Sequence, residues 1–280
     1  MNKIVVTADS TCDLSPELRE RYHVDLVPLY VNFGEDSRRD GVDAKPDDIY
    51  EYYRSTGKLT TTSAASPGDY HTFFKGFTDQ GYEVIHLNIS SSFSITHQNA
   101  MMAAGDLKGV YPVDSYNLST GTGLLVLAAC DMVKEGMPAL DIVSRLEEMR
   151  GRVRASFILD TLEYLWKGGR CSGITALGAN LLKLKPCIEV RDGKMGVGKK
   201  FRGNLSNVME QYTTTRLEGA HPELRRVFIT HSGIDQAIID RVAARVKQLH
   251  PFEEVLVTRA GCVVSNHCGP NTLGVLFIEK

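Results

Sequence analysis

Apolar and polar residues alternate in blocks along the first half of the chain, and the blocks predict strands that are each followed by a helix. Short apolar runs rich in Val and Ile are typical of buried strands, and here they cover residues 3–8, 24–31, 82–89 and 110–113. Longer segments with helical periodicity follow, several of them after Ser-Pro, Lys-Pro or serine starts. One begins at Ser15-Pro16-Glu17, and the others cover residues 46–54, 67–77, 96–105 and 120–134. This order predicts a parallel sheet with helices on both faces.

The pattern changes after Arg150, where strands are no longer separated by single helices. Apolar runs predict strands at 153–159, 185–190, 226–230, 253–259 and 273–278, with helices at about 161–166, 173–183, 204–217 and 235–248. Asp192-Gly193 between two short apolar runs is typical of a β-hairpin turn. We therefore predict an α/β protein with two domains, a parallel-sheet domain at 1–150 and a mixed-sheet domain at 151–280.

Composition restricts the class of protein. Of the 280 residues, 42% are hydrophobic and 24% are charged, as in globular domains, and the net charge is −2. This balance gives no reason to expect nucleic acid or an anionic membrane as a partner. The cysteines form no CxxC pair, and the apolar start reaches Asp9 too soon for a signal peptide. The expectation is a cytoplasmic protein with reduced thiols.

Small polar residues gather in loops that follow the predicted strands. Ligands of open α/β sheets bind outside the carboxyl ends of the strands, so these loops are candidates for one shared site. His267 lies beside a Gly-Pro turn that restricts its loop, and it adds one ionisable ring. Hydroxyls, an imidazole and a guanidinium together favour a receptor for a small anion. The loops are Asp9–Thr11, Thr61–Ser63, Ser90–Ser94 and Lys167–Arg170.

Two glycine-rich segments were weighed as nucleotide sites. The segment Gly193–Lys200 nearly matches GxxxxGK[ST], but Lys200 replaces the hydroxyl that would hold magnesium, so a basic hairpin is favoured. Gly121 and Gly123 begin a helix after a strand, but Val126 replaces the third glycine of the dinucleotide pattern. A close contact between helix and strand is favoured there.

Metal and hydrolase sites were also weighed. Cys262, His267 and Cys268 lack a second ligand pair at zinc spacing, so no metal is expected. No GxSxG elbow is present, and no serine is marked as a partner of His267, which leaves an acyl hydrolase as a minor alternative.

The same polar segments, in the same order, resemble the motifs of the DegV family. The family patterns are Asp-Ser-Thr-x-Asp-Leu, Thr-Ser-x-x-Ser, Ser-Ser-x-Leu-Ser-Gly-Thr-Tyr-Gln, Lys-Gly-Gly-Arg-Ile-Ser and His-x-Gly-Pro-Gly. The matching segments span almost the whole chain and are Asp9–Leu14, Thr62–Ser66, Ser90–Gln98, Lys167–Ser172 and His267–Asn271.

The resemblance implies a two-domain fold that binds one long-chain fatty acid between the domains. Some members are the fatty-acid-binding subunit of a two-component fatty acid kinase, in which a separate subunit supplies ATP and the product is an acyl phosphate. By position, the residues that would hold the carboxylate are Thr62, Ser63, Ser91, Ser92, Ser94 and His267. Arg170 and Arg202 would face the kinase subunit and the transferred phosphate. The chain itself would need no cofactor, and a transient contact with a membrane is compatible with the role.

This chain departs from the family pattern at several positions. In the serine loop Phe93 replaces Leu, Ile95 replaces Gly and His97 replaces Tyr. Cys171 replaces Ile, and Asn271 replaces the final Gly. A β-branched residue resists positive φ, so Ile95 is the largest departure, whereas Asn tolerates left-handed geometry.

An acyl chain needs an apolar slot as well as a polar end. Phe157–Leu159 and a helix bearing Ile174, Leu177, Leu181 and Leu182 are candidates, although both are equally compatible with ordinary core. The main alternative function is a lipid carrier or sensor with no link to a kinase.

Overall fold

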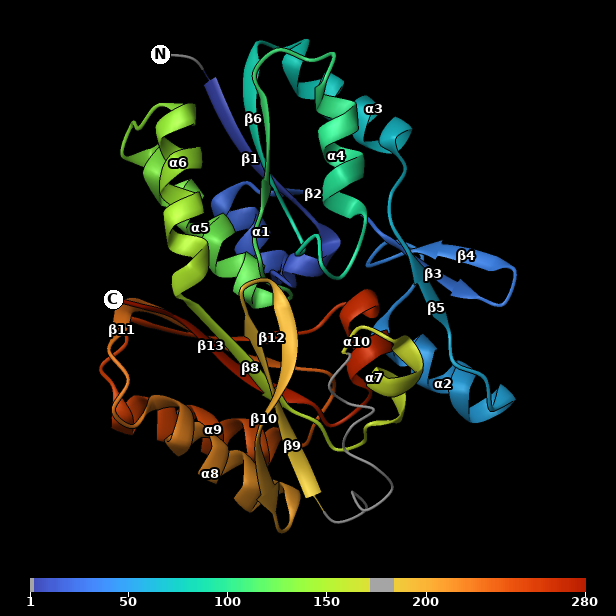
Figure 1. Ribbon diagram of the computed structural model, residues 1–280, viewed down its shortest axis with the longest axis vertical. Coiled ribbons are helices and arrows are strands. Elements are labelled where there is room, and N and C mark those ends of the chain that lie inside the picture. Colours follow the sequence, from blue (N-terminus) through green and yellow to red (C-terminus); the bar gives the residue numbers. More distant parts are fainter. Residues whose placement is uncertain (1–2, 172–183) are drawn as a thin grey trace.

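The computed structural model describes residues 3–171 and 184–280 (Figure 1). Two large β-sheets lie one above the other in this view, with helices between them and on their outer faces. Among the described residues, no helix has the length and apolar character needed to cross a membrane. The predicted helix at 173–183, with its four candidate slot residues, lies outside the described residues.

The N-terminal sheet is parallel, as predicted. Its order is β2-β1-β6-β7, and its strands are β1 (Lys3–Asp9), β2 (Asp25–Val27), β6 (Tyr82–Asn88) and β7 (Val110–Asp114). Two helices, α3 (Pro67–Thr78) and α4 (Thr96–Ala104), cover one face through an aromatic core, and α1 (Pro16–Tyr22) follows β1. The other face packs on α5 (Thr120–Lys134) and α6 (Ala139–Met149), the second of which was not predicted.

The prediction of a single strand at 24–31 is wrong. The strand β2 ends at Val27, directly before Pro28, which has no backbone N–H to donate to a ladder. After it, β3 (Tyr30–Phe33) joins β4 (Asp36–Arg39) and β5 (Thr61–Ser63) in a separate antiparallel sheet of order β4-β3-β5. Helix α2 (Pro46–Thr56) lies in the same protruding part of the molecule (Figure 1).

The C-terminal sheet is mixed, again as predicted. Its order is β10-β9-β8-β13-β11-β12, and only β11 and β12 run parallel. The strands are β8 (Val153–Ile158), β9 (Leu184–Arg191), β10 (Lys194–Arg202), β11 (Pro222–His231), β12 (Glu254–Arg259) and β13 (Leu273–Glu279). Helices α8 (Leu205–Leu217) and α9 (Gln236–Leu249) cover its outer face.

Helix α5 is the centre of the molecule, because its side chains are buried on almost every side. One hydrophobic cluster runs from β1 and β6 through α5 and α6 to the inner face of β8, β9 and β13. The layers are therefore helices, parallel sheet, helices, mixed sheet and helices. Ser119 precedes α5, but its side chain does not cap the helix as predicted, since its hydroxyl donates to Asp13 Oδ2 (2.5 Å).

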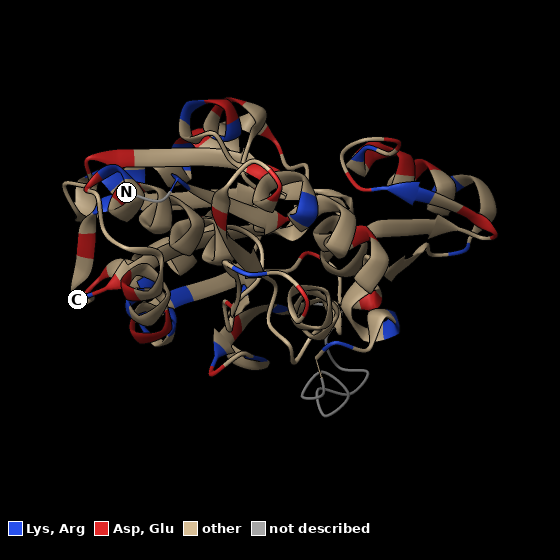
Figure 2. Cartoon of the chain, turned by 90° about the horizontal axis from the view of Figure 1, so that it is seen from above, with Lys and Arg blue, Asp and Glu red and all other residues tan. Residues whose placement is uncertain are grey.

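Two short helices, α7 (Glu163–Gly168) and α10 (Cys262–Cys268), lie at the junction of the two halves. Helix α10 follows β12 in sequence, yet it packs on Leu29, Val31 and Ile49 of the N-terminal half. The boundary at residue 150 stays a prediction. Figure 2 shows charges of both signs interspersed over the outer helices and loops.

Candidate functional site

Residues from three of the four polar loops predicted to converge line one cavity of about 530 Å³ between the two halves, whereas Asp9, Ser10 and Thr11 are not among its lining residues. The residues that it brings together include Thr62, Ser63, Ser91, Ser92, Ser94, Arg170 and His267. The rest of the lining is largely apolar and comes from both halves, with Leu29, Ile89, Phe93, Leu118, Leu165, Met195 and Val264 among its members. A polar cluster at one side of an apolar hollow is suited to an amphipathic ligand.

Arg202 is not brought into this cavity. It lies on β10 and lines a separate surface hollow with Lys199, Lys200 and Arg245. Phe157, Ile158 and Leu159 do not line the cavity either. Phe157 and Ile158 are 5% and 0% exposed because β8 is an inner strand of the sheet, and Leu159, directly after β8, is 0% exposed. All three residues therefore belong to the hydrophobic core.

Thr62 and His267 form the central pair of the cavity. The chain places Thr62 on β5 through its pairing with Val31, while His267 lies near the end of α10. Thr62 Oγ1 and His267 Nε2 are 2.9 Å apart and share a hydrogen bond. A second bond joins the same elements, since the Thr60 hydroxyl donates to Asn266 Oδ1. The small β3–β5 sheet therefore brings a threonine of the N-terminal half to a histidine of the C-terminal half.

Buried carboxylates of the N-terminal half hold the start of α10. The backbone N–H of Cys262 donates to Asp40 Oδ1 (2.7 Å), and the N–H of Gly261 donates to Asp13 Oδ1 (2.8 Å). Ser10 donates its hydroxyl to Asp40 Oδ2 (2.9 Å). Burial raises the pKa of the Asp13 carboxyl to about 8 and raises that of Asp40. These contacts fix α10, and with it His267, against the N-terminal half.

Asp9 holds the start of the serine loop, as Asp13 and Asp40 hold the start of α10. Its carboxylate accepts from the N–H groups of Thr11 (3.0 Å) and Ile89 (2.8 Å), which lie after β1 and β6. Burial raises the pKa of this carboxyl, while these bonds to the charged form oppose the rise. The ends of two neighbouring strands are thus tied together directly before the serines.

The serine hydroxyls of the 90–94 loop differ in whether they are free to bind a ligand. The hydroxyl of Ser90 is buried and donates to the carbonyl of Gly193 (2.8 Å) in the β9–β10 turn, and Ser94 Oγ bonds Thr96 Oγ1 (2.7 Å). Within residues 3–171 and 184–280, the hydroxyls of Ser91 and Ser92 have no hydrogen-bond partner, and both residues are exposed. These two hydroxyls are the ones best placed to donate to a ligand.

Ile95 does not strain the serine loop. Its φ is −75°, so the positive φ that a β-branched residue resists is not required here. Asn271 does adopt positive φ (59°), as the glycine of the family pattern would, and its amide donates to Asp160 Oδ2 (3.1 Å).

The imidazole of His267 is neutral near pH 7. Burial of the ring, with a smaller contribution from the charge of Arg170, lowers its pKa to about 4. Nδ1 is buried and has no hydrogen-bond partner among the described residues. An unpaired acceptor costs less than an unpaired donor in such a place, so we assign the proton to Nε2, which donates to Thr62 Oγ1. The Thr62 hydroxyl is then available to donate its own hydrogen to an anion.

The Nδ1 side of the ring lies against Gly168, the last residue of α7. A Cβ built on Gly168 would overlap Nδ1 and lie 3.2 Å from Cε1. Gly169 follows with φ 66° and turns the chain, which leads to the exposed Arg170 at the cavity. Arg170 donates from Nη1 to the carbonyl of Gly168 (2.7 Å), and it makes no ion pair with any described residue. In the Gly168–Arg170 segment, the first glycine therefore packs closely on the His267 ring. The arginine, two residues later, presents a guanidinium that is available at the cavity.

The alternative sites are not supported by the geometry. Gly193–Lys200 forms the β9–β10 turn and strand β10, so no helix N-terminus faces a phosphate there. A Cβ at Gly123 would lie 2.8 Å from the Cys12 carbonyl oxygen, so the close contact of this helix is with the short 3₁₀ helix Ser10–Cys12 that follows β1 and not with a strand. His267 lacks the carboxylate that orients the base of a hydrolase triad, at least among the described residues. Across the same residues, no group of His, Cys, Asp and Glu is placed to hold a metal.

Comparison with known proteins gives the family. The model of a family described as "Uncharacterised protein, DegV family" matches residues 3–280. The chain belongs to the DegV family. A DegV domain-containing protein of Clostridium perfringens is 32% identical over the full length of both chains.

Solved structures of DegV proteins share the fold. A DegV family protein from Thermus thermophilus, described as fatty-acid-binding, is 32% identical, with a TM-score of 0.90 and full coverage of both chains. A stearic-acid-binding protein from Eubacterium ventriosum is 28% identical, with a TM-score of 0.87 and 99% of this chain and 98% of that chain covered. The parallel N-terminal and mixed C-terminal sheets are therefore those of DegV structures.

Proposed function

We propose that this DegV protein binds one long-chain fatty acid in the cavity between its halves. The observation that carries the proposal is the hydrogen-bonded Thr62–His267 pair, which lines the same, otherwise largely apolar cavity as the available hydroxyls of Ser91 and Ser92. Solved DegV structures described as fatty-acid-binding support the same ligand class. In this proposal the carboxylate lies at Thr62, Ser91 and Ser92, and the acyl chain contacts the apolar lining.

Both ends of the ligand are served by this arrangement. Each buried methylene contributes about 0.8 kcal/mol, so a C16 chain gives roughly 12 kcal/mol before association costs are subtracted. The carboxylate loses its hydrogen bonds to water on binding, so the protein must supply hydrogen-bond donors in their place. Thr62 supplies one through its hydroxyl, because His267 Nε2–H already occupies a lone pair of Thr62 Oγ1.

We further propose that the bound acid is presented to a separate ATP-dependent kinase subunit. Arg170 is exposed, carries an available guanidinium and lines the cavity, so it is placed to neutralise charge where a phosphoryl group would arrive. A carboxylate oxygen attacks the γ-phosphorus of ATP held by the partner, ADP leaves, and the product is an acyl phosphate. The part of the chain that the structure describes has no nucleotide loop, so ATP is assigned to the partner. Arg202, on a separate surface, would contribute by contacting the partner rather than the ligand.

Replacing Thr62 by valine is expected to weaken fatty acid binding by about 10- to 100-fold. The substitution keeps the shape of the side chain but removes a donor to a charged group, which is worth about 1.5–3 kcal/mol. Mass spectrometry of lipid extracted from the purified wild type should find fatty acid at near one-to-one stoichiometry. Titration of both delipidated proteins with palmitate then gives the affinities.

Thr61 offers a matched control on the same strand. It is exposed, is not among the residues that line the cavity and accepts from Asn32 Nδ2 (3.3 Å), so Thr61→Val should leave palmitate affinity unchanged. Wild-type protein that retains no lipid and does not bind palmitate would refute the proposed ligand. Release of free acid from an acyl thioester, abolished by His267→Ala, would instead favour a hydrolase.

Arg170→Ala separates the kinase role from a simple carrier or sensor. We expect this variant to bind palmitate as the wild type does, because Arg170 bonds the backbone of Gly168 and no cavity hydroxyl. With a fatty acid kinase subunit and ATP, acyl phosphate formation should fall at least tenfold, since an arginine that neutralises transferring phosphate contributes several kcal/mol. Equal acyl phosphate formation by both proteins would contradict this role for Arg170, and none from the wild type would favour the carrier.

A further inference from the structure

A second cavity, of about 490 Å³, lies between the halves and shares no lining residue with the fatty acid cavity. It begins where the ladder between β8 and β9 ends. The paired register runs from Ile158–Cys187 to Ala155–Val190, and the next residues along the two strands, Arg154 and Arg191, line the cavity. Tyr116, Asn117 and Arg150 complete it from the N-terminal half.

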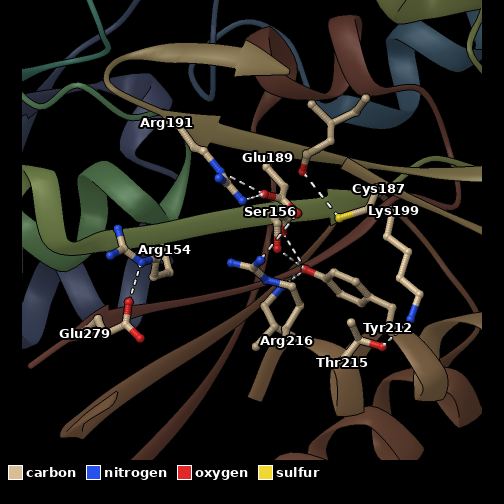
Figure 3. Close-up of polar contacts among 12 residues, drawn as sticks. Arg154, Ser156, Cys187, Glu189, Arg191, Lys199, Tyr212, Thr215, Arg216 and Glu279 are labelled. Atoms are coloured by element: carbon tan, nitrogen blue, oxygen red, sulfur yellow. Dashed lines mark hydrogen bonds and ion pairs between the residues drawn. The ribbon is translucent and has the colours of Figure 1, made fainter. Parts of the chain in front are cut away.

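Arginines from four separate segments meet at this cavity. Arg150 follows α6, Arg154 lies on β8, Arg191 ends β9, and Arg216 lies in the last turn of α8. Figure 3 shows three of them around the strand ends, with Arg191 and Arg216 directed toward Glu189 and Arg154 directed toward Glu279. A cavity of this size, lined by convergent polar groups, falls within the range of small-ligand sites, about 300–1,000 Å³.

The carboxylates at the cavity do not satisfy all of the arginines. Glu279 accepts from Arg154 Nε (2.5 Å), and Glu189 accepts from Arg191 Nη2 (2.5 Å). Glu189 is then 3.5 Å from Arg216 Nη1, which is a long contact. Asp192 is the remaining acidic residue of the lining, and it is exposed at the hairpin turn.

Arg150 and Arg216 are the two guanidinium groups whose ion pairs are long, at 3.9 and 3.5 Å. Arg150 donates to the Asp114 carbonyl (3.0 Å) and stacks 3.9 Å from the Tyr116 ring centroid, while its ion pair with Glu147 is 3.9 Å long. The side chain of Arg216 is 17% exposed. Its Nε is buried, and no described residue offers it an acceptor.

The side chains of Arg150 and Arg216 keep 20% and 17% exposure and have only long contacts with carboxylates, and ordered ligands commonly satisfy charged donors of this kind. Arginine forks match the oxygens of phosphate in both spacing and charge. We propose that this cavity is a second ligand site, which binds a small anion carrying a phosphate group. The site does not depend on the fatty acid, and because Arg150 and Arg216 belong to different halves, the bound anion would link them.

Calorimetric titration with inorganic phosphate and with pyrophosphate, at constant ionic strength, tests the site. One anion should bind per chain, and Arg216→Met should weaken that binding by about tenfold or more, as expected for a lost charge-assisted hydrogen bond. Palmitate affinity should not change, because the two cavities share no lining residue.

Arg145→Met is the matched control, because it removes the same charge from an exposed residue paired with Glu148 (2.9 Å). It should leave phosphate binding unaltered. The proposal is overturned if neither probe binds saturably, if Arg216→Met binds as the wild type does, or if Arg145→Met loses as much affinity. Circular dichroism checks folding, and if Arg216→Met does not fold, the same comparison with Arg150→Met decides, since that residue reaches the cavity from the other half.

Discussion

Replacing Arg226 by methionine is expected to destabilise the protein by about 3 kcal/mol. Arg226 on β11 and Asp131 on α5 are 7% and 8% exposed, and their side chains join the two halves through bonds of 2.5 and 3.1 Å. Arg226 also donates to Glu254 (2.9 Å) and to the Tyr22 hydroxyl (2.7 Å). Removing one partner of a buried ion pair leaves an uncompensated charge, which costs about 3–5 kcal/mol. We expect a loss of stability at the lower end of this range because Arg225 still contacts Asp131 (2.8 Å) in the variant.

Urea denaturation monitored by circular dichroism measures the difference. Arg145→Met again serves as the control, since its exposed pair with Glu148 should contribute about 0–1 kcal/mol. The double variant Arg226→Met/Asp131→Leu should be less destabilised than the sum of its single variants, because neither charge is then left alone in the interior. A loss below about 1 kcal/mol for Arg226→Met would show that the pair does not hold the halves together.

The layered fold could be predicted because most of its buried elements leave a periodic pattern in the sequence, although α6 was missed. Short apolar runs became the inner strands of both sheets, and the Asp192-Gly193 turn formed the predicted hairpin with φ of 49° and 75°. The break at Pro28 also had a signal, since proline rarely continues a central strand. The small sheet that follows had none, because strands such as β4 are exposed and mostly charged.

The site was predicted in part for the same reason. The serine loop follows β6 and His267 precedes the turn at Gly269 and Pro270, and the fold brings both to one cavity. Thr62 lies inside β5, which was not predicted, and reaches the same cavity through the pairing of β5 with β3. Asp13 and Asp40 gave no comparable signal. Asp13 bonds Gly261 across 248 positions of sequence, and only the folded chain shows that both carboxylates hold α10. The resemblance to the family implies that Arg202 faces the kinase subunit together with Arg170, whereas β10 places Arg202 in a separate surface hollow.

Replacing Gly168 by alanine is expected to lower fatty acid affinity by about 10- to 100-fold without unfolding the protein. The new methyl group would overlap Nδ1 of His267, and α10, which carries the ring, is held in place at its start by Asp40 and Asp13. The ring must therefore turn away from Thr62, which loses its bond to Nε2 and with it the orientation of the hydroxyl. Loss of one oriented donor to a carboxylate is worth about 1.5–3 kcal/mol. Palmitate titration gives the affinity, and the imidazole NMR signals report the position of the ring.

Gly76→Ala is the matched control for this substitution. Gly76 lies within α3, its added Cβ would meet nothing within 4 Å, and its φ is not positive, so palmitate affinity should stay at the wild-type value. Alanine also has the better helix propensity, by about 1 kcal/mol, so neither variant should lose stability through the backbone. Wild-type affinity in Gly168→Ala, together with unshifted imidazole signals, would show that the histidine tolerates the methyl group. The close packing of α7 on His267 would then have no part in holding the carboxylate.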